Sequence, residues 1–65
     1  MYRKINKDRG YGDTVYEVVS IARKGAPGEE YTLRDIKGNK VNIYSAHTYL
    51  PTVWEIRQFK AAEKK

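Results

Sequence analysis

Basic side chains gather at the two ends of this 65-residue chain. Residues 1–9 carry a net charge of +3 and residues 57–65 another +3, whereas residues 10–56 come to −1. Positive charge concentrated in this way attracts polyanions. Because the termini of compact domains often lie close together, we expect the two ends to form one basic patch. The competing interpretation is that charged ends only keep a small protein soluble.

Six tyrosines and one tryptophan supply aromatic faces on which nucleic-acid bases could stack,. Together with cations for phosphate contacts they give a candidate nucleic-acid-binding set: Arg3, Lys4, Lys7, Arg9, Tyr11, Arg34, Lys40, Tyr44, Trp54, Arg57 and Lys60. We expect that replacing Lys4, Lys7 and Arg9 together with alanine leaves folding nearly unchanged and weakens binding. Trp54 has a second interpretation, which we favour: the largest side chain of a core-poor domain is buried.

The chain lacks the residues on which most catalytic and metal sites are built. Without cysteine it has no thiol nucleophile, no disulfide and no Cys-rich zinc site,. Its one histidine, His47, would have to act with Ser20 or Ser45, and neither serine lies in a nucleophile-elbow sequence,. The adjacent acids Glu29 and Glu30 are typical of a solvated turn. We therefore expect no enzymatic activity, no cofactor and no metal.

Three segments with β-strand composition follow one another between Thr14 and Ser45. They read TVYEVVSIAR, YTLRDI and VNIYS, with the turn-rich KGAPGEE and the tight KGNK between them, which is typical of an antiparallel meander,. Apolar residues fall on both parities of the first segment, which predicts a bend or bulge near Val18 and Val19. Alternation in the other two segments predicts inward side chains at Tyr31, Leu33, Val41 and Ile43, and outward ones at Thr32, Arg34, Asn42 and Tyr44.

The two ends of the chain are assigned from weaker signals. Residues 1–9 alternate loosely and could form an edge strand, and residues 46–50 fit a single 3-10 turn before Pro51,. Residues 52–55 have the form of a capping box, which predicts a helix from 53 to about 63. The alternation of apolar and charged residues there predicts instead a closing strand at about 53–57 with a helical or frayed tail, and we favour this strand.

A chain of 65 residues forms only one small domain,. We expect a basic arm and loop over 1–13, a barrel over 14–57 and a basic tail over 58–65. No apolar run approaches the ~20 residues of a membrane span, and no signal peptide is recognisable, so we expect a soluble, cytoplasmic protein without membrane association. The expected core comprises the aromatic residues and Val15, Val18, Val19, Ile21, Leu33, Ile36, Val41, Ile43, Leu50, Val53 and Ile56.

The order of strands and turns resembles an SH3-like antiparallel barrel of about five strands. Val15-Tyr16-Glu17-Val18, Tyr31-Thr32-Leu33-Arg34-Asp35 with Gly38, and residues 41–50 are similar to the C-terminal SH3-like domain of retroviral and retrotransposon integrases. Tudor-like and KOW-like barrels share this pattern. The resemblance covers about 37 residues. It implies the fold, and with it nucleic-acid binding or contact with a protein partner.

Two functions follow as hypotheses. The leading one is a small module that binds DNA or RNA largely non-specifically through its basic termini and exposed aromatic residues. The alternative is a protein-interaction module, for instance a phage or mobile-element protein that docks on a host protein and modulates it, with Tyr11, Tyr44, Tyr49 and Trp54 as anchors. A homodimer formed through a sheet edge is a third, structural interpretation. Steep salt dependence distinguishes phosphate-driven binding from aromatic docking.

Overall fold

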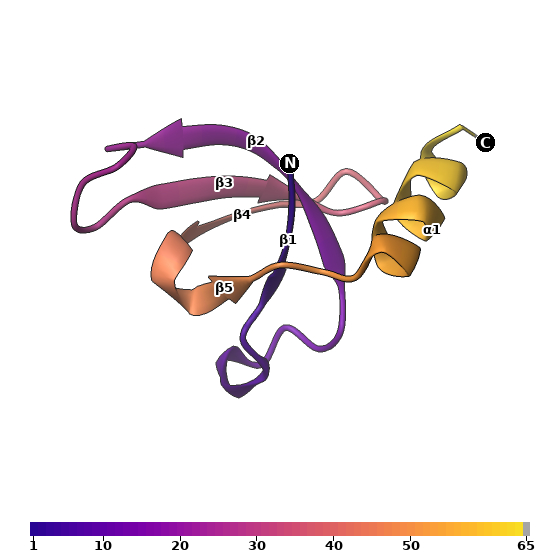
Figure 1. Ribbon diagram of the computed structural model, residues 1–65, viewed down its shortest axis with the longest axis horizontal. Coiled ribbons are helices and arrows are strands. Elements are labelled where there is room, and N and C mark those ends of the chain that lie inside the picture. Colours follow the sequence, from indigo (N-terminus) through magenta and orange to yellow (C-terminus); the bar gives the residue numbers. More distant parts are fainter. Residues whose placement is uncertain (65) are drawn as a thin grey trace.

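The computed structural model describes residues 1–64 and shows five antiparallel strands followed by a C-terminal helix (Figure 1). The elements are β1 (Tyr2–Ile5), the 3-10 turn η1 (Lys7–Arg9), β2 (Val15–Ala22), β3 (Glu30–Arg34), β4 (Lys40–Tyr44), the 3-10 turn η2 (Ser45–His47), β5 (Thr48–Tyr49) and α1 (Val53–Glu63). The prediction of a mainly β fold with about five strands and a short 3-10 turn is confirmed.

The strands form one sheet in the order β4-β3-β2-β1-β5. Every neighbouring pair is antiparallel, and consecutive strands pair except where β5 returns to lie beside β1. Among residues 1–64 the ladder of backbone hydrogen bonds does not close on itself, because β4 and β5 are its two edges. The residues after β5 cross toward β1 and lead directly into α1 (Figure 1).

The long strand β2 contains the predicted irregularity. Its pairing register with β3 shifts between Val18 and Ser20, so Val19 is an extra residue and its side chain is exposed. An extra residue reverses the side-chain parity of a strand. The bulge therefore explains why Tyr16 and Val18 before it, and Ile21 after it, all pack on the same core.

The core lies on the sheet face opposite α1 and is built from Ile5, Tyr16, Tyr31 and Leu33. Val18, Ile21, Val41 and Ile43 pack against it, which confirms the inward set predicted from alternation. The prediction was wrong for four other residues, because Val19, Ile36, Leu50 and Val53 are exposed and do not belong to the core. They occupy the bulge, a turn, the segment before Pro51 and the first helical position, where the local backbone turns the side chain outward.

The favoured closing strand at 53–57 is wrong, because the segment forms the helix α1. Its first turn has the capping box: the Thr52 hydroxyl accepts from the Glu55 backbone N–H at 3.2 Å, and the Glu55 carboxylate accepts from the Thr52 N–H at 2.8 Å. The Phe59 side chain, 5% exposed, packs edge-on against Tyr2 with ring centroids 5.3 Å apart. The tail is thus a docked helix. None of the helices formed by residues 1–64 has the length and apolar character of a membrane span.

Candidate nucleic-acid interface

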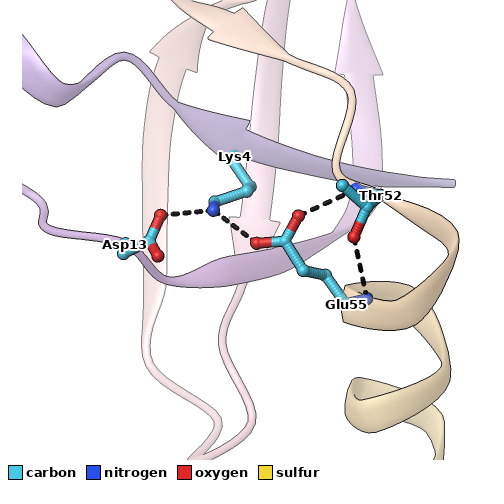
Figure 2. A network of polar contacts seen from close by, with 4 residues as sticks. All are labelled: Lys4, Asp13, Thr52 and Glu55. Atoms are coloured by element: carbon cyan, nitrogen blue, oxygen red, sulfur yellow. Dashed lines mark hydrogen bonds and ion pairs between the residues drawn. The ribbon is translucent and has the colours of Figure 1, made fainter.

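Lys4 is a structural cation inside the domain. Its side chain is 5% exposed, and its ammonium forms ion pairs with both Asp13 and Glu55 (Figure 2). Hydrogen bonds to Asp13 and then to Glu55 raise the pKa of Lys4 above its ordinary value, against the effect of burial. The ammonium is therefore committed to two carboxylates and is not presented to a phosphate. Because the ammonium is buried between two carboxylates, we now expect the combined alanine replacement of Lys4, Lys7 and Arg9 to affect folding.

Two other predicted phosphate contacts, Arg3 and Arg34, are also held by the protein. The Arg3 Nε donates to the Thr48 hydroxyl at 2.9 Å, and its guanidinium carbon lies 5.8 Å from the centre of the Tyr31 ring. The Arg34 guanidinium donates to Glu17 at 2.5 Å and to Glu63 at 2.9 Å. These hydrogen bonds, with Glu17 first, raise the pKa of Arg34. Both arginines therefore connect strands or dock the helix.

The free cations of the two chain ends do not meet. Lys7 and Arg9 lie on η1, where Arg9 donates to Nδ1 of His47 at 3.0 Å. Figure 1 places η1 on one side of the molecule and the C-terminal end of α1 on the other. Strand β1 does contact α1, through Tyr2 and Phe59, but its own two cations are held by the protein, since Lys4 is buried and Arg3 donates to Thr48. Within residues 1–64, the cations of η1 and those of α1 therefore do not form the expected single basic patch.

Helix α1 separates its charges between two faces. Its two acidic residues, Glu55 and Glu63, both turn toward the sheet and pair with Lys4 and Arg34. Its two basic residues, its tryptophan and the C-cap residue Lys64 are all exposed, and the Lys60 ammonium lies 5.8 Å from the centre of the Tyr2 ring on β1. We call the exposed set the basic helix face, and it comprises Trp54, Arg57, Lys60 and Lys64. With about 100° per residue, Arg57 and Lys64 lie roughly 60° and 80° around the helix from Trp54, whereas Lys60 lies roughly 120° away.

Trp54 is exposed, so the favoured interpretation of a buried tryptophan is wrong. Its side chain is 71% exposed, and the Arg57 guanidinium carbon lies over the ring, 5.3 Å from its centre. Leu50 and Val53, which precede Trp54 closely in the chain, are exposed as well. Trp54 is the second residue of α1, and the side chain that packs between α1 and the sheet is Phe59.

The remaining candidate residues lie away from α1. Tyr44 and Lys40 belong to the exposed side of β4, and Tyr11 lies in the loop between two glycines with positive φ. Tyr44 meets the His47 ring at 6.1 Å between centroids, and both line an open cavity of about 400 Å³. The other lining residues are Ala26, Pro27, Gly28, Glu29, Ser45 and Ala46. The predicted residues thus divide between the basic helix face and a separate aromatic cavity.

Glu55 should make stability depend on pH in acid. Hydrogen bonds from Lys4 and then from the Thr52 backbone lower its pKa from 4.5 to about 2. A carboxylate with a depressed pKa stabilises the folded state above its unfolded pKa, and this stability is lost as pH falls toward the folded value. Urea unfolding should therefore show the parent more stable than Glu55→Gln near pH 6, with the difference shrinking between about pH 4.5 and 2. An unchanged difference across that range would contradict this assignment.

Comparison with protein-family models, with curated proteins and with solved structures gave no match. Within residues 1–64, no group of three or more histidine and acidic side chains is placed to hold a metal ion. The functional proposal therefore rests on how α1 is docked on the sheet and on which of its side chains are exposed. Its first and last turns are held to the sheet by ion pairs, and its outer side presents cations next to an open indole ring.

Proposed function

We propose that this protein binds nucleic acid non-specifically through the basic helix face. The observation that carries this proposal is the charge separation of α1, in which both carboxylates face the sheet and the cations face solvent. Flexible cations on an exposed helix suit phosphate contacts, which supply affinity without reading sequence. The exposed ring of Trp54 adds a surface for stacking,.

The internal ion pairs gather half of the acidic side chains into two clusters, each with one cation and two carboxylates. The two clusters centred on Lys4 and Arg34 take up four of the eight acidic side chains but only two of the 13 basic ones. Eleven basic and four acidic residues of the sequence remain outside these clusters. Because the carboxylates nearest to α1 are already paired, a phosphate that approaches the helix meets mainly positive groups.

The test is a salt titration of binding to a short fluorescein-labelled oligonucleotide of mixed sequence, followed by anisotropy. Replacing Arg57 and Lys64 together with alanine should weaken binding at low salt by roughly tenfold or more. The slope of log affinity against log salt should become shallower by roughly 1.5 to 2, because two phosphate contacts are lost. Both side chains are exposed, so the thermal unfolding midpoint should change little,.

The matched control is the double variant Lys7→Ala, Lys24→Ala, which removes the same charge from exposed positions outside α1. It should retain most of the affinity and most of the salt slope. Equal losses in the two double variants would show a response to net charge alone and would contradict a site on α1. Absence of binding by the parent at low salt would remove the proposal altogether.

The alternative function, a protein-interaction module, is supported by the cavity beside Tyr44. Its lining is largely uncharged, with Pro27 and Ala46 next to two aromatic rings and Glu29 as the one acidic group. Aromatic residues around a concavity are typical anchors of protein interfaces. A pull-down from lysate with and without nuclease separates the two functions, because a partner held through nucleic acid is released by nuclease. The variant Tyr44→Ala should weaken only a partner that remains bound.

A further inference from the structure

The exposed indole ring of Trp54 indicates whether the basic helix face would bind single-stranded or double-stranded nucleic acid. The side chain is 71% exposed, and Arg57 lies over the ring while the rest of the ring faces solvent. A planar base can stack on such a ring, with the guanidinium close by for a phosphate. The buried contact between α1 and the sheet is made by Phe59, so Trp54 is not needed to dock the helix.

A base inside a duplex cannot use this surface. Both of its faces are covered by neighbouring base pairs, and only bases in single strands, loops or ends can be splayed onto an aromatic side chain. Leu50 and Val53, which precede Trp54 in the chain, are also exposed apolar side chains, and such groups gain from contact with an unstacked base but little from a phosphate backbone,. The apolar part of the site therefore favours unpaired nucleotides.

The platform is rigidly held, which lowers the entropic cost of stacking. Trp54 occupies the second position of α1, directly between the two capping-box residues, Thr52 and Glu55. Figure 2 shows the Glu55 carboxylate bonded to the Thr52 backbone and to Lys4 of β1 at the same time. The first helical turn is thus fixed to the sheet, and its outward side chain is presented in a defined direction.

The spacing along the helix suits a short segment. With a rise of about 1.5 Å per residue, Trp54 and Lys64 are separated by roughly 15 Å along the axis, with Arg57 and Lys60 between them. We propose that unpaired nucleotides, DNA or RNA, are the preferred ligand of the basic helix face, with one base stacked on Trp54 and the following phosphates on the helix cations. This inference rests on the proposed function and specifies its substrate class.

Trp54 is the only tryptophan of the sequence, so its own fluorescence reports the contact. The protein should be titrated at low salt with a mixed-sequence oligonucleotide as a single strand and as the duplex with its complement. The single strand should bind roughly tenfold more tightly and quench the fluorescence, whereas duplex should leave it nearly unchanged. Trp54→Ala should lower single-strand affinity by roughly five- to 100-fold, and Trp54→Phe should recover part of it.

The matched control is Tyr44→Ala, which removes another exposed aromatic side chain and should leave the single-strand preference intact. Equal or tighter binding of duplex, without quenching, would overturn this inference and leave the proposed function standing. A Trp54→Ala variant with parental single-strand affinity would overturn it as well. If neither oligonucleotide binds at low salt, the proposed function fails with it, and the exposed apolar surface is then explained by protein docking.

Discussion

Replacing Lys4 with methionine should destabilise the domain by about 3 kcal/mol, the lower end of the range for removing one partner of a buried ion pair. The methionine side chain keeps most of the aliphatic volume, so the loss isolates the ammonium group. Without it, Glu55 remains a carboxylate at the edge of the helix–sheet contact with its main partner gone. The Asp13 side chain is mostly exposed and can be hydrated by water instead. The loss of stability therefore comes mainly from Glu55, whose partly buried carboxylate is left without the ammonium. Urea unfolding at pH 7 should show a lower midpoint with an unchanged slope.

Two further variants show whether the loss of stability comes from the buried ion pair. Lys7→Met changes the same chemistry at an exposed position and should stay within about 0.5 kcal/mol of the parent,. The double variant Lys4→Met, Glu55→Gln should recover part of the stability lost by Lys4→Met, because an amide can keep the cap on Thr52 without leaving an unpaired charge,. A Lys4→Met protein that unfolds at the parental urea concentration would show that the pair contributes nothing.

This result also decides how binding should be tested. A combined alanine variant of Lys4, Lys7 and Arg9 changes a buried ion-pair centre together with two surface cations. Weaker binding by that variant would not distinguish lost phosphate contacts from a loosened α1. The double variant Arg57→Ala, Lys64→Ala avoids this ambiguity, because neither side chain takes part in an ion pair that docks the helix.

The sheet could be predicted from sequence because its signals are local. Alternation along β3 and β4 correctly assigned Leu33 and Ile43 inward and Asn42 and Tyr44 outward. Broken parity in β2 located the bulge at Val19. When one face of a strand is buried, apolar and polar residues alternate with a period of two, so the inward side chains can be assigned from the sequence. A bulge adds one residue and reverses which positions face inward. Neither inference required knowledge of distant residues.

The position of Lys4 could not be predicted in the same way. Several nearby residues in the sequence, among them Arg3, Asn6 and Lys7, are basic or polar, and they suggest a solvated arm. Its burial depends on Asp13, nine residues away, and on Glu55, 51 residues away. A lysine is almost never fully buried unless it is paired, so the partners decide the outcome. The expected basic patch failed for a separate reason, because η1 and the C-terminal end of α1 lie on different sides of the molecule (Figure 1).

Helix α1 shows a different limit. The capping box formed by Thr52 and Glu55 was visible in the sequence and was the correct signal, whereas the alternation around Trp54 was misleading. The choice between helix and strand depended on Phe59, whose contact with Tyr2 connects opposite ends of the chain. Size alone favoured a buried Trp54, but the register of the helix placed the smaller Phe59 toward the sheet.

Replacing Phe59 with alanine should lower the free energy of unfolding by about 3 kcal/mol, the lower end of the range for such a change in a core. It is the one buried side chain of Val53–Glu63, and its ring packs on Tyr2. A 65-residue domain has a total stability of roughly 3 to 10 kcal/mol, so this loss removes a large share of it. Thermal unfolding followed by circular dichroism should show a midpoint lower by roughly 10 °C or more.

The matched control is Val53→Ala, which shortens an exposed apolar side chain of the same helix. It should change the free energy of unfolding by about 0.5 kcal/mol or less,. If Phe59→Ala loses helical signal while the sheet stays folded, α1 is a separable element held by Phe59 and its two ion pairs. Loss of both signals together makes the helix part of one cooperative unit. Parental stability in Phe59→Ala would contradict the docked helix itself, and with it the separation of charges that turns the cations of α1 toward solvent.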